Sequence, residues 1–193
     1  QLGKKPILIN DLKLIINAID EFNKIEKKRL RDKAILLIGF SGGFRRSELV
    51  EIEHDDVEFV SEGIKIFIKR SKTDQSGEGM IKAIPYFENK NFCPVTNLKK
   101  WIDYSNLKSG KIFNISDKSV ALIIKKYASL SGLDPNMYGG HSLRSGFATS
   151  AAEAGAEERN IMAMTGHKTT QMVRRYIQEA NIFKNNALNN IKF

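Results

Sequence analysis

Two arginines that each follow a pair of glycines are the side chains in this sequence best suited to chemistry. Arg45 lies in the string GGFRRSEL (42–49), and Arg144 lies in GGHSLRSG (139–146). Each guanidinium can fork onto the non-bridging oxygens of a phosphodiester, and a glycine pair lets backbone and ligand approach closely. Glu48, three residues after Arg45, is placed to orient it. Either string alone is typical of a capped helix end with solvated arginines, but the two together indicate a shared anion site.

Three further kinds of side chain supply what phosphodiester cleavage needs. His141 shares a helix face with the second arginine, and the string TGHKTTQMVRRYI places His167 nine residues before Tyr176. A histidine can bind the phosphate or handle a proton near neutral pH, and a tyrosine hydroxyl can be the nucleophile. Lys72, in the basic string RSKTD, can protonate the leaving oxygen. No metal or other cofactor is needed, because the arginines supply the charge stabilisation. Considered alone, Tyr176 fits a core tyrosine and RSKTD a solvated turn.

The composition favours a globular protein with a polyanionic partner. The chain has 193 residues, with 31 Lys and Arg against 22 Asp and Glu, a formal net charge of +9 and a pI near 9.6. Such an excess favours nucleic acid as the partner. The single cysteine, Cys93, excludes a disulfide framework and a cysteine zinc site within the chain. No apolar run approaches the ~18 residues of a membrane span, and the basic N-terminus lacks the apolar region of a signal peptide. Because the first residue is Gln, we expect a piece of a longer protein.

The apolar pattern predicts a mainly α, α+β fold in which helices surround a small three-stranded antiparallel sheet. Strands are expected at 57–60, 64–69 and 80–84, and in the second of them Ile64, Ile66 and Ile68 alternate with Lys65, Phe67 and Lys69. Helices are expected around 11–22, 34–40, 46–52, 95–102, 120–127, 140–155, 157–164, 169–176 and 181–191. The first helix should be capped by Asn10 or Asp11 and should bury Leu12, Ile15, Ile16, Ile19 and Phe22. The tyrosines other than Tyr176 are expected to lie in the core or at its edge: Tyr86, Tyr104, Tyr127 and Tyr138.

The motifs together resemble the catalytic domain of the tyrosine recombinases, the phage-integrase family. The order and spacing of the family's motifs are kept from about Leu8 to Lys184. The matches are the Gly-x-Arg-x-Ser-Glu-Leu string at 43–49, the hairpin lysine at Lys72, the His-x-x-Arg motif at His141 and Arg144, the Gly-His motif at Gly166 and His167, and the nucleophile at Tyr176.

This resemblance implies a role for each matched residue. Arg45, Arg144 and His167 would bind the scissile phosphate, Lys72 would be the general acid, and His141 would assist as base or positioner. Tyr176 would form a 3′-phosphotyrosyl link and free a 5′-hydroxyl, with Glu48 at the family's supporting acidic position. Basic residues beside the motifs are expected to contact DNA: Arg46, Lys69, Arg70, Lys168, Arg174 and Arg175.

The resemblance also implies how the protein is organised. Residues 1–180 would form the catalytic domain and residues 181–193 a helical segment exchanged between protomers, while the family's N-terminal DNA-binding domain is not in this chain. The expected partners are double-stranded DNA, further copies in a tetramer on two DNA sites when full length, and accessory DNA-bending proteins. The isolated domain would be a monomer. The expected setting is the cytoplasm, at the nucleoid, of a bacterial or phage system, with no membrane partner.

Three other functions stay open at this point. A type IB topoisomerase-like enzyme would use the same chemistry to relax DNA, although the short chain and the SKTD and TGH strings favour a recombinase. A decayed integrase could bind DNA without catalysis, although the six matched residues argue against it. A histidine metalloenzyme using His141 and His167 is weaker still, because the remaining histidine, His54, lies in an acidic stretch without ligand spacing.

Overall fold

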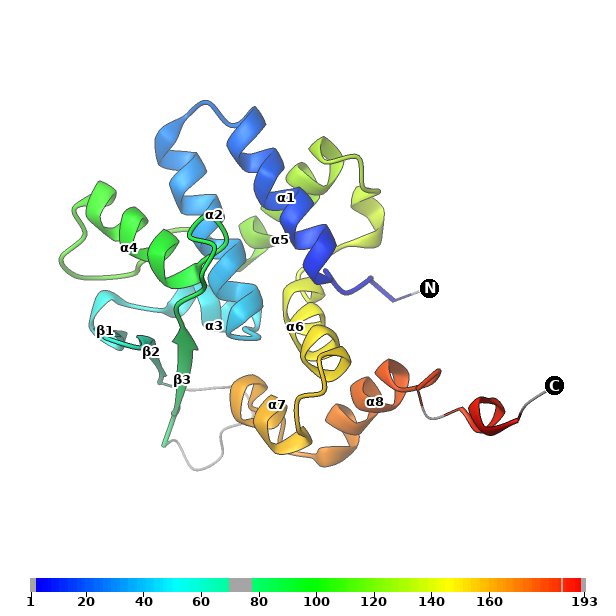
Figure 1. Ribbon diagram of the computed structural model, residues 1–193. Coiled ribbons are helices and arrows are strands. Elements are labelled where there is room, and N and C mark those ends of the chain that lie inside the picture. Colours follow the sequence, from blue (N-terminus) through cyan, green and yellow to red (C-terminus); the bar gives the residue numbers. More distant parts are fainter. Residues whose placement is uncertain (1–2, 70–77, 185, 192–193) are drawn as a thin grey trace.

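The computed structural model describes residues 3–69, 78–184 and 186–191, so Arg70 and Lys72 lie outside it (Figure 1). Its α-helices are α1 (Ile9–Phe22), α2 (Glu26–Ser41), α3 (Arg46–Glu51), α4 (Pro94–Ser105), α5 (Asp117–Leu130), α6 (Ser142–Glu153), α7 (Glu158–Thr165) and α8 (Thr170–Ala180). The strands are β1 (Val57–Val60), β2 (Gly63–Ile68) and β3 (Met80–Pro85), and short 3₁₀ helices are η1 (His54–Asp56), η2 (Pro135–Met137) and η3 (Ala187–Asn190). The mainly α fold with an antiparallel sheet is therefore confirmed.

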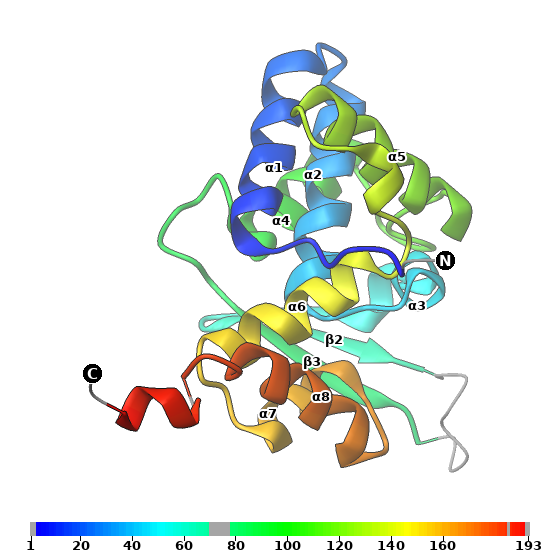
Figure 2. The ribbon, with the colours of Figure 1, turned by 90° about the vertical axis from the view of Figure 1, so that its right-hand side faces the viewer.

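Helix α2 forms the centre of the larger core, as its apolar run predicts. Residues 32–41 are all buried, and the helix packs against α1, α4 and α6 (Figures 1 and 2). Its buried polar groups have partners: the Asp32 carboxylate accepts from the Tyr127 hydroxyl at 2.8 Å, and Lys33 Nζ donates to Asn91 Oδ1 at 2.6 Å. The last residue of the helix is Ser41, and its C-cap is Gly42, the first residue of the first arginine string.

The sheet has the order β1-β2-β3, with both pairs antiparallel. Ile64, Ile66 and Ile68 are buried while Lys65 and Phe67 are exposed, which confirms the predicted alternation along β2. On β3 the buried positions are Lys82 and Ile84. One strand of this sheet thus brings a lysine into the interior.

A second, smaller apolar cluster holds the end of the chain that carries Tyr176. It consists of Ala148, Ala152, Ile161 and Val173, contributed by α6, α7 and α8. Helix α6 passes from the large core into this cluster, and α7 also contacts β3 (Figures 1 and 2). The two arginine strings and the tyrosine helix therefore meet around α6.

The segment before α1 is bound to residues much later in the chain. The backbone N–H of Lys5 donates to Met137 O at 2.6 Å, and that of Ile7 donates to Ser142 O at 2.9 Å. Ile7 is fully buried, and a Cβ added to Gly146 would lie 2.0 Å from its carbonyl oxygen. The segment consequently lies against the first turns of α6.

Several local predictions were wrong. Helix α1 begins at Ile9 after Leu8 and has no side-chain cap, because Asn10 and Asp11 already lie within its first turn. Leu12, Ile15, Ile16 and Ile19 are buried as expected, but Phe22 is 48% exposed at the helix end, where the chain turns at the buried Asn23. Tyr127 and Tyr138 lie in the core, whereas Tyr86 and Tyr104 are 46% and 47% exposed.

The segment after α8 is not the α-helix that the sequence predicts. It forms a turn after Asn181 and the short 3₁₀ helix η3, which stands clear of the other helices in both views (Figures 1 and 2). Asparagine side chains bind the backbone there: Asn186 Oδ1 accepts from the Leu188 N–H, and Asn189 Nδ2 donates to Phe183 O. Such local bonds compete with an α-helix.

Candidate active site

Arg144 lies at the centre of the site and connects the motifs. Its side chain is buried on α6, and its Nη1 donates to the Gly43 carbonyl at 2.8 Å and to the Thr165 carbonyl at 2.5 Å. These carbonyls come from the first arginine string and the Gly-His string, so one guanidinium ties both to α6. Its Nη2 is buried and has no hydrogen-bond partner within the described residues. Burial, and then the nearby Arg45, lower the pKa of Arg144 to about 10.

Arg45 is held by the carboxylate predicted to orient it. Glu48 Oε1 accepts from Arg45 Nη1 at 2.8 Å, and Glu48 Oε2 accepts from the Arg45 backbone N–H at 3.2 Å. The glutamate therefore fixes both the side chain and the start of α3. Gly43, two residues earlier, has φ +56°, and a Cβ there would lie 2.9 Å from the Phe147 ring. The turn thus needs glycine at position 43 for two reasons: its backbone has a positive φ, and a larger residue would collide with the Phe147 ring.

The second glycine pair also makes room for a protein side chain. A Cβ on Gly140 would lie 2.1 Å from both Cδ and Nε of Arg46. Arg46 therefore crosses directly over the backbone that leads into α6. The sequence predicts that a ligand approaches the backbone at a glycine pair, whereas in this structure the side chain of Arg46 does so at Gly140.

His167 lies beside the two arginines and is buried. Thr165 Oγ1 donates its hydrogen to Ile161 O at 3.0 Å, so the 2.6 Å contact with His167 Nδ1 is assigned as Nδ1–H donating to Thr165. Nε2 is then the nitrogen that can accept or, in the cation, donate. Burial, followed by the charges of Arg144, Arg45 and Lys82, lowers the pKa of His167 to about 4.

Tyr176 lies on α8 next to His167. The centroids of the two rings are 6.4 Å apart, and the tyrosine packs against the small cluster between α6 and α8. Its ring therefore lies beside the imidazole that adjoins the two arginines. Arg45, Glu48, Arg144, His167 and Tyr176 are thus brought together from four elements or their connecting turns.

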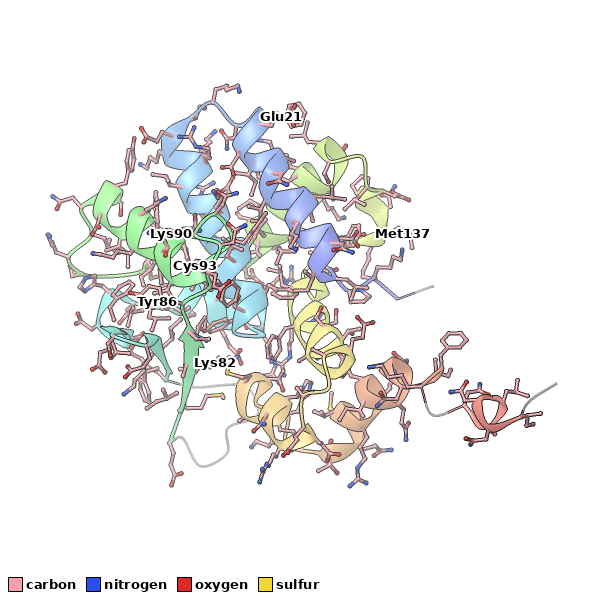
Figure 3. All side chains as sticks on the ribbon, in the orientation of Figure 1. Glu21, Lys82, Tyr86, Lys90, Cys93 and Met137 are labelled. Carbon is pink, nitrogen blue, oxygen red and sulfur yellow. The ribbon has the colours of Figure 1, made fainter. Side chains whose placement is uncertain are left out.

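Lys82 belongs to this group and was missed by the sequence interpretation. Its side chain is fully buried on β3, and its Nζ donates to the Gly42 carbonyl at 2.7 Å (Figure 3). Burial lowers the pKa of Lys82 to about 7, and Arg144 and Arg45 act in the same direction while Glu48 opposes them. The sequence did hold one indication of this role, because Lys82 lies on the same face of the expected strand 80–84 as the apolar Ile84.

The remaining sequence candidates are exposed or lie outside the described residues. His141 is the exposed residue before α6, and its ring makes no hydrogen bond within residues 3–69, 78–184 and 186–191. Lys69 is bound by Glu53 at 2.5 Å and Asp56 at 3.4 Å. Arg174 pairs with Glu158 and Arg175 with Glu179, each at 3.2 Å, and Lys168 is exposed.

A hollow of about 610 Å³ opens beside Arg45, between α3 and β2. Among the described residues, its lining includes the acidic Glu48, Glu51, Glu53 and Asp56 and the basic Arg45 and Lys69. Across the part of the chain that the structure describes, no group of three or more His, Cys, Asp or Glu residues is arranged to hold a metal ion, and no helix could cross a membrane.

Comparison with known proteins shows the family of the chain. The model of the phage integrase family matches residues 7–181. The chain is 48% identical over 202 residues to an integrase/recombinase xerD homolog of Selenomonas ruminantium, which covers 98% of this chain and 58% of the relative.

Two solved structures share the fold. XerH site-specific recombinase, in a pre-cleavage complex with its difH substrate, matches with a TM-score of 0.73 and 19% identity over 94% of this chain and 53% of its own. A lambda integrase tetramer bound to a Holliday junction matches with a TM-score of 0.64 and 18% identity, over 100% and 52%. The chain spans little more than half the length of these three proteins. The chain belongs to the phage integrase family of tyrosine recombinases.

Proposed function

We propose that this chain is the catalytic domain of a site-specific DNA recombinase that cuts and rejoins DNA through a phosphotyrosine link. The Tyr176 oxygen attacks the scissile phosphorus, the bond to the 5′-oxygen breaks, and Lys72 gives that oxygen its proton. The tyrosine proton leaves with the assistance of His141. The reverse attack by a 5′-hydroxyl on the phosphotyrosine rejoins DNA without ATP, because the ester conserves the bond energy.

The buried Arg144 guanidinium is the observation that carries this proposal. Its Nη2 is buried without a partner in the described structure, and burying an unpartnered cationic donor is costly. A phosphate oxygen would supply the missing acceptor, with Arg45 beside it. Because a phosphate would offset the positive charges that lower its pKa, His167 could then bind a proton and donate from Nε2.

The proposed partners follow from the family and the charge of the chain. Double-stranded DNA is the substrate, and the DNA-bound XerH structure supports a DNA-facing site in this fold. We propose that the full-length protein acts as a tetramer on two DNA sites, by analogy with the lambda integrase tetramer bound to a Holliday junction. Residues 1–180 would act as the catalytic unit and 181–193 as the exchanged segment, in the cytoplasm of a bacterium.

The test is covalent capture on a nicked duplex that carries the recombination site, identified first in the DNA flanking the gene. Cleavage next to a nick releases a short strand, so the protein–DNA adduct accumulates and is resolved by denaturing electrophoresis. Tyr176→Phe should form no adduct but bind DNA with nearly unchanged affinity, because only the hydroxyl is removed. Tyr104→Phe, at an exposed tyrosine on α4, is the matched control and should form adducts normally.

Two results would contradict the proposal. Adducts that persist in Tyr176→Phe would assign the nucleophile to another residue. A wild-type protein that binds the site but never forms an adduct would indicate a silent DNA-binding protein. Joining of two separate duplexes, rather than relaxation of one, is the expected activity of the full-length protein.

A further inference from the structure

Strand β3 places a lysine where the fold calls for an apolar side chain. Lys82 is fully buried, whereas its neighbour Ile81, on the opposite face of the strand, is 62% exposed. The sheet thus turns an isoleucine to solvent and an amine to the interior. Burying a charged or polar group is unfavourable unless it is well bonded, and packing alone gives no reason for this arrangement.

The amine of Lys82 is directed at the turn that precedes Arg45. Its Nζ donates to Gly42 O at 2.7 Å and lies 4.3 Å from the centroid of the Phe44 ring. The next carbonyl along the chain, Gly43 O, accepts from Arg144 Nη1 at 2.8 Å. Two adjacent carbonyls are therefore held by two cations that come from different elements, β3 and α6.

This turn determines where both arginines of the site can lie. Arg45 follows Phe44 directly, and Arg144 depends on Gly43 O for one of its two hydrogen bonds. The groups that interact with the amine through their charges are Arg45 and Glu48 at α3, Arg144 on α6 and His167 before α8. Lys82 is consequently embedded in the site, where its amine is bonded to the Gly42 carbonyl of the turn.

We propose that Lys82 is a positioning residue for phosphodiester cleavage: by holding the Gly42–Gly43 turn it keeps Arg45 and Arg144 aligned on the scissile phosphate. The proposal rests on the recombinase function above. It assigns Lys82 no contact with the reacting atoms and no proton transfer, which remain with Tyr176 and Lys72.

The test compares single-turnover adduct formation at saturating nicked DNA. Lys82→Met removes the donor but keeps a long side chain of similar volume, so the melting temperature and DNA affinity should stay near those of wild type. The adduct should form roughly 10–100-fold more slowly, the usual effect of misplacing a reacting group by about 1 Å. Lys65→Met, at an exposed lysine on β2, removes the same charge and should have the wild-type rate.

A double-mutant cycle separates positioning from a general structural role. Because Lys82 acts through the arginines, Lys82→Met should slow an Arg144→Lys protein much less than it slows wild type. Lys82→Leu, which likewise lacks the donor, takes the place of the methionine variant in this cycle if the latter does not fold. Additive effects on the rate would overturn the proposal, as would a folded Lys82→Met protein with the wild-type rate.

A substrate with a sulfur leaving group tests the remaining assignment. Such a substrate needs no proton at the leaving atom, so it should not restore the rate of Lys82→Met. Restoration would make Lys82 the proton donor and overturn the positioning role. If wild type itself forms no adduct, the proposed function fails; if wild type and Lys82→Met form it equally, only this inference fails.

Discussion

At the level of single residues, the positive charges of the site lower the proton affinity of neighbouring groups, and a bound anion would raise it again. Arg45, Arg144 and Lys82 gather with Glu48 as the carboxylate that bonds one of them, and His167 lies among these cations. Each cation lowers the proton affinity of its neighbours. A phosphate would reverse this effect, so the protonation of the site and the binding of DNA are coupled.

The depressed pKa of His167 predicts how stability varies with acidity. The folded protein binds this proton only near pH 4, whereas the unfolded chain binds it near 6.5. Between these values the unfolded state carries more protons on His167, so the contribution of this residue to stability is fully present above pH 6.5 and falls as the pH drops toward 4. His167→Gln should lose several degrees less in melting temperature than wild type over this interval, as measured by thermal unfolding without DNA. An equal loss in both proteins would contradict the assignment.

Lys72 is predicted from the sequence to protonate the 5′-oxygen. Lys72→Ala should slow cleavage of normal DNA by roughly 10²–10⁴-fold, the range typical of general acid catalysis. A substrate with sulfur at the leaving position should be cleaved by this variant at a near-normal rate. Equal slowing with both substrates would make Lys72 a DNA contact instead.

At the level of elements, the sequence predicts most of the features that depend on the spacing of apolar residues. The alternation along β2, the buried α2 and the order of helices are confirmed because apolar spacing decides which face is buried. The pairing of Arg45 with Glu48 also follows from spacing along one short helix. These features depend on neighbours close in the chain.

The errors concern partners that are distant in the sequence. Nothing near Lys82 indicates that its amine meets the Gly42 carbonyl, 40 residues away. The ion pairs of Lys69 with Glu53 and Asp56 likewise join residues that are far apart in the sequence. Nor does spacing show that Gly140 accommodates the Arg46 side chain. Such contacts depend on the tertiary arrangement.

The segment after α8 offers its apolar side chains to solvent. Ile182, Phe183, Leu188 and Ile191 are 63%, 84%, 62% and 53% exposed. Deleting residues 181–193 should therefore change the melting temperature little, but should weaken DNA-dependent assembly of the full-length protein. Thermal unfolding and sizing of the DNA complex measure the two effects. If assembly declines only as far as loss of folding explains, the segment is ordinary core.

At the level of the whole molecule, the net charge of +9 predicts salt-sensitive binding to DNA. Phosphate contacts release counterions, so affinity should fall at least about tenfold between 50 and 200 mM salt. Lys168→Gln should reduce the slope of log affinity against log salt by about 1, because this exposed lysine has no ion pair with another described residue. Lys69→Gln is the matched control, since carboxylates already bind Lys69. Salt-independent binding, or equal slopes for the two variants, would contradict this prediction.

The hydrogen bonds that join residues 4–7 to η2 and to the start of α6 have a consequence for synthesis on the ribosome. Lys4 donates to the carbonyl of Asn136, 132 residues further along, and the burial of Ile7 requires the nearby turns of α6. At about 5–20 residues per second, this partner is made roughly ten seconds after the segment itself. During that interval Ile7 lacks the turns of α6 that bury it, although α1 can already pack against α2 and α5. Partly synthesised chains should therefore be sensitive to protease at residues 4–8 until α6 has emerged, whereas the finished protein should resist cleavage there.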